Sequence, residues 1–280
     1  MSILEKKIAA ITAGLILIAG IVLSASAQYT DPRAAEIIET AWQEYEKSIE
    51  NIDDYVVETD LFTIYYNKAY DNGRPYFTAR TETDIFGGFE STTTASDADL
   101  FTPETYDKLK QNARYEGRDE VDGHEVHVLF VERIEGMFPD AEDVLEEGLE
   151  QMRIYIDADN WVIRQMSYMA EAETETGEVR QVEPVIMFRD YRNIDGMMVA
   201  FETTTVVTGL SASMTEEERR DAEESLREME RELEQMSDQE RRMVERIMGN
   251  RMESFREMLM EDRFEFTVRV NEVRVNTGLD

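Results

Sequence analysis

Strand-like segments separated by tight-turn signals dominate this chain and restrict what it can fold into. Two-residue turns occur at Asn72-Gly73, Asp122-Gly123 and Asp195-Gly196, among segments rich in Val, Ile, Thr, Tyr and Phe. Asn-Gly and Asp-Gly pairs accept the positive φ angles that a two-residue hairpin requires. A series of hairpins builds an antiparallel sheet, so the sequence predicts a meander of neighbouring strands.

The pattern predicts an α+β fold with two helices and a run of strands. The first helix covers residues 31 to about 51 and the second covers 103–112, each with a proline near its start. The expected strands are 55–67, 76–86, 89–96, 125–132, 153–156, 161–170, 179–192, 197–208 and 264–275, with an acidic loop at 136–151.

A segment with a different residue pattern lies between the last two predicted strands. Thr215-Glu216-Glu217-Glu218 and Ser237-Asp238-Gln239-Glu240 are capping boxes, and apolar residues recur after each at steps of three and four. These features predict a helical hairpin inserted at residues 214–262. Its methionines leave two interpretations open, a structural insertion or an adaptable apolar surface for a partner or an acyl chain.

The N-terminus has the form of a secretory signal. Lys6 and Lys7 precede an uncharged apolar stretch at 8–23, and Ala25 and Ala27 stand where a signal peptidase reads small residues. We expect cleavage after Ala27, which leaves residues 28–280 as one exported domain in the periplasm; the alternative is an uncleaved anchor. The chain has no cysteine, so we expect neither disulfides nor the lipid attachment of a bacterial lipoprotein.

The chain carries a formal net charge of -33. Such a charge argues against nucleic acid or an anionic membrane as a standing partner, because both would repel it. A halophilic source and an ordinary acidic surface both fit this composition. We expect a monomer.

No group of residues in the sequence indicates a catalytic, cofactor or metal site. His124 and His127 lack the His-Glu-x-x-His spacing of a zinc protease and, three apart on a strand, point to opposite faces; we expect two partly exposed strand or turn histidines. Asp157, Asp159 and Asn160 begin like a calcium loop but lack its glycine and distal glutamate, which favours a hairpin turn. There is also no Gly-x-Ser-x-Gly nucleophile elbow.

Several strands and the first helix carry an excess of large apolar side chains. These side chains form either an ordinary core or the wall of an apolar cavity between the helix and a curved sheet, open to a lipid chain. The candidates are Trp42, Tyr45, Phe62, Ile64, Tyr66, Trp161, Ile163, Met169, Ile186, Phe188, Phe264 and Phe266.

The order of short segments along the chain resembles the LolA family of outer-membrane lipoprotein-sorting proteins. The segments are Asn72-Gly73-Arg74-Pro75-Tyr76-Phe77, Arg114-Tyr115-Glu116-Gly117 through His124, Tyr155-Ile156-Asp157-Ala158-Asp159, Phe188-Arg189-Asp190-Tyr191-Arg192 with Ile194-Asp195-Gly196, and Val273-Arg274-Val275-Asn276. The resemblance covers most of residues 55–280 outside the predicted helical hairpin. The strong negative charge and that hairpin depart from the family pattern.

The resemblance implies an incomplete β-barrel with a helical lid, whose cavity carries the acyl chains of lipoproteins through the periplasm. The implied partners are lipoprotein acyl chains or lipid, an inner-membrane release complex and an outer-membrane receptor. In this family an arginine on a strand after the first turn holds the lid, and Arg80 is the candidate here. The alternatives are an envelope sensor of the RseB type, which signals through a protein partner, and an extracytoplasmic hydrolase.

Overall fold

The computed structural model describes residues 30–82, 102–132, 149–173, 179–209 and 262–279, with isolated positions between 219 and 260. Its helices are α2 (Pro32–Ser48) and α3 (Pro103–Asn112). Its strands are β1 (Asp54–Thr59), β2 (Thr63–Asp71), β3 (Arg74–Glu82), β4 (Ala113–Val121), β5 (His124–Val131), β6 (Leu149–Asp157), β7 (Ile163–Glu173), β8 (Val179–Ile194), β9 (Met197–Thr208) and β10 (Arg263–Val275). The predicted signal peptide at 1–27, the strand at 89–96 and most of the acidic loop at 136–151 lie outside the described residues.

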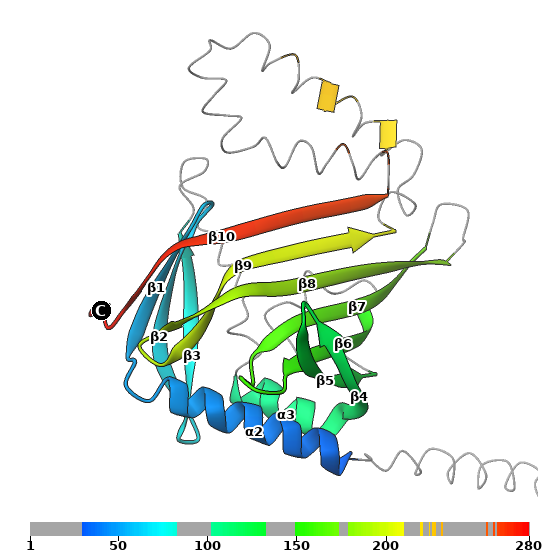
Figure 1. Cartoon of the computed structure of the whole chain (residues 1–280). Coiled ribbons are helices and arrows are strands. Elements are labelled where there is room, and N and C mark those ends of the chain that lie inside the picture. Colours follow the sequence, from blue (N-terminus) through cyan, green and yellow to red (C-terminus); the bar gives the residue numbers. More distant parts are fainter. Residues whose placement is uncertain are drawn as a thin grey trace, which may run out of the picture.

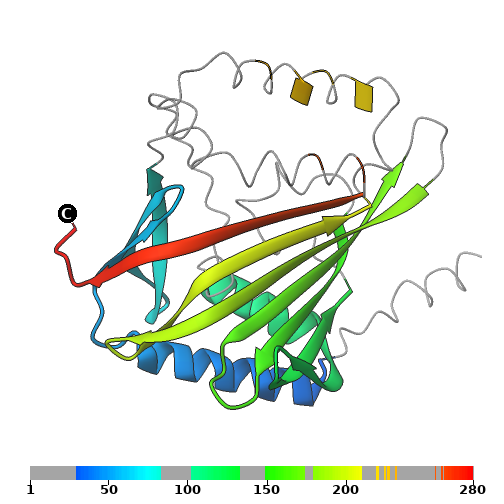
Figure 2. The same cartoon turned by 45° about the horizontal axis from the view of Figure 1, so that its top comes forward.

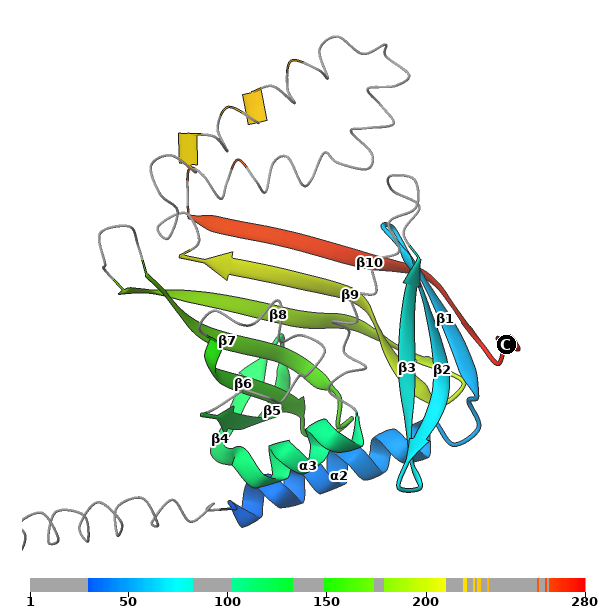
Figure 3. The same cartoon turned by 180° about the vertical axis from the view of Figure 1, so that it is seen from behind.

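The ten strands form one antiparallel sheet in the order β3-β2-β1-β10-β9-β8-β7-β6-β5-β4. In the described residues β3 and β4 are its two edges, so the sheet is open. It is strongly curved: β1–β3 stand at one end, β4–β7 curl at the other, and the long strands β8–β10 span the distance between them (Figures 1, 2 and 3). The predicted incomplete barrel is therefore confirmed as an open, curved antiparallel sheet accompanied by two helices.

The hairpin turns form where the sequence places them. Asn72 and Gly73, Asp122 and Gly123, and Asp195 and Gly196 all have positive φ angles, between 50° and 101°. The flanking residues pair directly, as in Asp71 with Arg74. The two-residue turns thus fix the register of three hairpins, β2–β3, β4–β5 and β8–β9.

The predicted single strand at 55–67 is wrong, because two strands and a turn occupy this segment. The Thr59 hydroxyl accepts hydrogen bonds from the N–H groups of Leu61 (3.1 Å) and Phe62 (2.9 Å), and the Asp60 carboxylate accepts one from Arg269 N–H (3.0 Å). Side chains of this type compete with the strand ladder for backbone donors and favour a turn. The sequence prediction also missed β4, which continues directly from α3.

Both helices begin at a capped proline. The Asp31 carboxylate accepts hydrogen bonds from the N–H groups of Arg33 (2.8 Å) and Ala34 (3.3 Å), and the Thr102 hydroxyl accepts one from Thr105 N–H (3.2 Å). The buried positions of α2 recur at spacings of three and four; they are Ala34, Ile37, Ile38, Ala41 and Trp42. No helix in the described residues is both long and apolar enough to cross a membrane.

Two apolar clusters fill the side of the sheet that the helices cover. The larger cluster joins both helices to β4–β9 and consists of Ala34, Ile37, Ile38, Ala41, Trp42, Tyr106, Leu109, Ala113, Leu129, Val131, Met152, Ile154, Ile156, Ile163, Met166, Phe188 and Ala200. The smaller cluster lies past the C-terminal end of α2, against β1–β3 and β9, and consists of Ile49, Ile52, Val57, Tyr66, Phe77 and Met197. Helix α2 therefore bridges the two clusters.

Strands β9 and β10 pair with each other from Thr208 and Arg263 onward. Residues 209–262 consequently connect two adjacent strand ends. The predicted helical hairpin at 214–262 itself lies outside the described residues, apart from isolated helical positions such as Arg219 and Arg220.

Candidate functional site

A cavity lies between the two helices and the helix-covered face of the sheet. Its wall comes from α2, α3, β5, β6, β7 and the turn that precedes β7, and all of its side chains are aliphatic or aromatic. The lining residues are Ile38, Ala41, Trp42, Tyr106, Leu109, Leu129, Ile154, Ile156, Trp161 and Ile163. The side chains of the larger cluster thus enclose an apolar space.

This cavity is small. Its volume is about 40 Å³, room for roughly three water molecules. Sites that hold small organic ligands are about 300–1,000 Å³. The helices therefore close down on the sheet in this conformation, and a larger molecule enters only if a helix moves.

Trp161 stands at the wall in a constrained backbone conformation. Its φ of 59° is uncommon for a bulky residue. The preceding turn holds it there: the Asp157 carboxylate accepts hydrogen bonds from Asp159 N–H (2.9 Å) and Asn160 N–H (2.8 Å), and from Arg164 Nε (2.8 Å). These contacts confirm the hairpin turn at Asp157–Asn160 that the sequence favours over a calcium loop.

Burial alone raises the pKa of the Asp157 carboxyl, but the hydrogen bonds from Asn160 and Asp159 and the Arg164 guanidinium outweigh it and the pKa is lowered. The carboxylate is therefore ionised at neutral pH and acts as a turn-forming acceptor. The described residues contain no group of three or more His, Cys, Asp and Glu side chains arranged to hold a metal ion.

His124 and His127 point to opposite faces of β5, as expected. His127 is buried, however, so the prediction that it is partly exposed is wrong. Its ring stacks on Trp161 with centroids 5.6 Å apart, and Tyr115 Oη lies 3.4 Å from its Nδ1. Burial lowers the pKa of His127. This histidine is a neutral packing residue behind the cavity wall.

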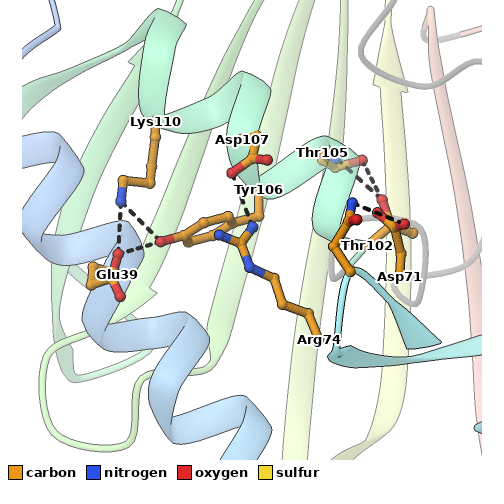
Figure 4. A network of polar contacts seen from close by, with 9 residues as sticks. Glu39, Asp71, Arg74, Thr102, Thr105, Tyr106, Asp107 and Lys110 are labelled. Carbon is orange, nitrogen blue, oxygen red and sulfur yellow. Dashed lines mark hydrogen bonds and ion pairs between the residues drawn. The ribbon is translucent and has the colours of Figure 1, made fainter. Parts of the chain in front are cut away.

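Polar contacts join the two helices at the outer side of the cavity (Figure 4). The Tyr106 hydroxyl donates a hydrogen bond to the Glu39 carboxylate, and Lys110 Nζ donates to Glu39 Oε2 (2.7 Å) and to the Tyr106 oxygen (3.0 Å). The hydrogen bond from Lys110, followed by that from Tyr106, lowers the pKa of Glu39 to about 2. Glu39 of α2 is thus the ionised acceptor of two groups on α3.

A second contact ties α3 to the sheet. Arg74, the first residue of β3, places Nη1 3.0 Å from Asp107 Oδ1, and its guanidinium lies over the Tyr106 ring at 5.0 Å (Figure 4). The Arg74 and Asp107 side chains are 39% and 57% exposed. The rim pairs, by which we mean Arg74–Asp107 and Lys110–Glu39, are therefore solvent-accessible ion pairs of modest strength.

Helix α2, in contrast, is fixed to the sheet at both ends. At its start the Asp31 carboxylate accepts a hydrogen bond from Tyr115 N–H of β4 (3.0 Å). At its end Lys68 of β2 donates to the carbonyls of Ile49 (2.6 Å) and Glu50 (3.2 Å), where a cation complements the helix dipole. Helix α3 continues directly into β4 at its C-terminal end, and the rim pairs join it to α2 and β3.

Most of the predicted cavity residues lie on the helix-covered face. In or against the larger cluster are Trp42, Tyr45, Trp161, Ile163, Ile186 and Phe188. In or against the smaller cluster are Ile64 and Tyr66. Phe264 and Phe266 share this face because Phe266 pairs with Thr205, which pairs with Ile186. Three of the twelve, Trp42, Trp161 and Ile163, line the cavity itself.

Phe62 and Met169 are placed elsewhere. Phe62 lies in the turn between β1 and β2. Met169 follows Tyr168, which packs against the larger cluster, so alternation directs Met169 to the opposite face. There its sulfur accepts a hydrogen bond from Gln181 Nε2 (3.7 Å).

Arg80 also lies on the opposite face. It pairs with Tyr65 across β2–β3, and its guanidinium lies over the Tyr65 ring at 4.8 Å. The neighbouring Ala79 packs against the smaller cluster, so Arg80 points away from the helices. Arg74 at the start of the same strand is the arginine that reaches α3.

The sequence prediction missed the contribution of α3 and of strands β5 and β6 to the cavity wall. Tyr106 and Leu109 are three positions apart on the predicted helix 103–112 and therefore share one face of it. That spacing is the sequence signal that could have identified the wall formed by α3. Leu129, Ile154 and Ile156 were expected on strands, but nothing local indicated that their face meets a helix.

Solved structures that match this chain include three at low sequence identity. A domain from Vibrio parahaemolyticus named for outer-membrane lipoprotein sorting has a TM-score of 0.43 and 9% identity, over 89% of this chain and 94% of that one. A DUF1329 family protein from Desulfovibrio piger has a TM-score of 0.40 and 11% identity, over 90% and 96%. A LolA superfamily protein from Nitrosomonas europaea has a TM-score of 0.29 and 8% identity, over 60% and 84%.

No family model matches the chain, and no curated protein matches it. At these levels of similarity the comparison carries no activity over to this chain, and the function has to be argued from the site.

Proposed function

We propose that this protein binds the acyl chains of lipid or of lipoproteins between its helices and its curved sheet, as a non-catalytic carrier in the periplasm. The observation that carries the proposal is the apolar space beneath a helix whose polar contacts to α2 and β3 include solvent-accessible ion pairs. The cavity wall is aliphatic and aromatic throughout, and exposed ion pairs keep α3 over it.

The energetics favour entry of an acyl chain by displacement of α3. Burial of each methylene contributes about 0.8 kcal/mol, so a sixteen-carbon chain contributes about 12 kcal/mol when fully buried. Withdrawal of Tyr106 and Leu109 from the larger cluster costs about 3–6 kcal/mol, and an exposed ion pair contributes about 1 kcal/mol or less. An acyl chain can therefore take the place of α3's apolar side chains.

In this mechanism α2 stays in place and α3 moves. Asp31 and Lys68 hold the two ends of α2 on β4 and β2, whereas α3 is joined to β4 at its C-terminal end and contacts α2 and β3 through the solvent-accessible rim pairs. Movement of α3 would bring Trp42 and Trp161, on opposite walls, into contact with the bound chain. No bond is made or broken, and the ligand is released as it was bound.

The two tryptophans of the chain provide the test, since both line the cavity. Bromine atoms on an acyl chain quench indole fluorescence at contact, so the methyl ester of 9,10-dibromostearate (called dibromostearate below) should quench the protein whereas methyl stearate should not. The single variants Trp42→Phe and Trp161→Phe each leave one reporter, and both should still be quenched.

Native mass spectrometry of the full chain purified from the cell envelope should in addition detect acyl-containing ligands. Binding of dibromostearate without quenching of either tryptophan would place the ligand elsewhere. A chain that neither binds the probe nor carries acyl ligands would contradict the proposed function.

A further inference from the structure

Trp42 carries an unusual polar group inside the cavity wall. The side chain is 5% exposed, and its ring contacts Tyr45 and Tyr106 with centroids 5.6 and 4.9 Å away. Within the described part of the chain, Trp42 Nε1 is the one buried side-chain nitrogen or oxygen that lacks a hydrogen-bond partner. An indole N–H is a donor only, so what it lacks is an acceptor.

A buried donor without an acceptor is costly, and folded proteins rarely keep one without a reason. The one hydroxyl among the lining residues, that of Tyr106, is already bonded to Glu39 and Lys110. A water molecule held in a cavity needs two to four polar partners, and this wall is otherwise aliphatic and aromatic. The acceptor that suits Trp42 is an oxygen carried in by an apolar molecule.

The charge around the cavity indicates which oxygen this is. Lys110 is paired with Glu39, and Arg74 with Asp107, at the solvent-accessible rim. Both cations lie over the ring of Tyr106, but neither is among the residues that line the cavity. An ionised carboxylate would lose its hydration there without a counterion. A neutral ester or amide carbonyl accepts the indole hydrogen bond with a far smaller loss of hydration.

We propose that Trp42 is the polar recognition group of the acyl site, with its Nε1–H donating a hydrogen bond to the neutral carbonyl of an ester- or amide-linked acyl chain. This inference rests on the proposed function. It adds that the site distinguishes acyl chains that carry a carbonyl from plain hydrocarbon, and that α2 supplies the distinguishing group.

The test compares probes of equal size in the full chain. Methyl palmitate and N-methylpalmitamide carry an ester and an amide carbonyl, and nonadecane has the same number of heavy atoms without one. Each is delivered from cyclodextrin, and its affinity is read from displacement of dibromostearate. Because the probes differ in solubility, the measured quantity is the ratio of affinities between wild type and Trp42→Phe for each probe.

We expect Trp42→Phe to weaken the two carbonyl probes about tenfold, equivalent to about 1.4 kcal/mol, and to leave nonadecane unchanged. Trp161→Phe is the matched control and should weaken all three probes equally. In ¹H–¹⁵N spectra of the wild type, the Trp42 indole signal should shift downfield with either carbonyl probe and keep its position with nonadecane.

The spectra keep the inference falsifiable if Trp42→Phe proves unstable. Equal affinity ratios for all probes, or a Trp42 indole signal that responds to nonadecane as it does to the ester, would overturn the inference while leaving the proposed function intact. Strong exchange of that indole proton with a bound water in the ligand-free protein would also overturn it. Failure of every probe to displace dibromostearate would instead count against the proposed function.

Discussion

The two apolar clusters share helix α2 but are constructed differently. In the smaller cluster the Tyr66 ring stacks on the Tyr55 ring with centroids 4.2 Å apart. The Phe77 ring meets the Tyr55 ring edge-on with centroids 4.8 Å apart. The larger cluster contains a cavity and a donor without a partner, and its second helix is held by exposed ion pairs. The smaller cluster is therefore packed around stacked aromatic rings, whereas the larger one leaves an apolar space beneath its second helix.

Buried polar contacts reinforce the smaller cluster. The Asp54 carboxylate accepts hydrogen bonds from the N–H groups of Thr277 (2.6 Å), Gly278 (2.9 Å) and Leu279 (3.3 Å). Burial raises the pKa of Asp54, but these hydrogen bonds outweigh it and the pKa is lowered. The segment after β10 is thereby fixed to β1, beside the strands that receive the end of α2.

Truncation of equal-sized side chains in the two clusters should give the largest effect. Ile52→Ala, at a fully buried position of the smaller cluster, should lower the free energy of unfolding by about 4 kcal/mol, since rigid surroundings leave a cavity. Leu109→Ala should cost about 2 kcal/mol, because α3 can settle toward the sheet. Urea unfolding measures both, and equal costs would contradict the difference between the clusters.

Removal of a rim pair should have a smaller effect that is confined to the larger cluster. Arg74→Gln breaks the contact with Asp107 and the stacking over Tyr106, so α3 should open about fivefold more often, equivalent to about 1 kcal/mol. Hydrogen exchange of the α3 amides measures this opening.

Arg80→Gln is the matched control for that experiment. Arg80 stands on the same strand and also lies over a tyrosine ring, but on the face away from the helices. It should leave exchange in α3 unchanged. If both variants accelerated exchange equally, general loosening of β3 would explain the effect of Arg74→Gln.

Local chemistry made the hairpins predictable, because Asn-Gly and Asp-Gly pairs set a turn wherever they occur. The turn at Thr59 and Asp60 was missed, since it depends on side-chain bonds to the backbone and on Arg269 of a strand two hundred residues away. The helix that carries Trp42 followed from its apolar spacing. The lack of a hydrogen-bond partner at its indole nitrogen could not be predicted, because it depends on what surrounds the ring.

The face of the sheet to which each side chain points was the least predictable property of the site. Met169 and Arg80 were chosen by residue type and strand membership, yet a shift of one position turns a side chain to the other face. The neighbours Tyr168 and Ala79 face the clusters instead. Only the register of the assembled sheet settles such a choice, whereas Trp42 and Trp161, chosen for their size, do line the cavity.

The smallest effect concerns the contact between the two helices. The pKa of Glu39 falls from 4.5 to about 2 in the folded protein, so its ionised form stabilises the fold above pH 4.5. That contribution is lost as the pH falls from about 4.5 toward 2. Because the side chains of Glu39 and Lys110 are 42% and 33% exposed, solvent screening keeps it below about 1 kcal/mol.

Glu39→Gln should therefore be slightly less stable than wild type at pH 7, and the difference should shrink between pH 4.5 and pH 2. Urea unfolding at constant ionic strength measures it. Glu36→Gln, which removes the partner of Arg33 on the same helix, is the control for a general loss of charge from α2. A Glu39→Gln difference that stayed constant down to pH 2 would mean that Glu39 joins the helices through shape and not through its charge, and the rim of the larger cluster would then be less sensitive to acid than its ion pairs indicate.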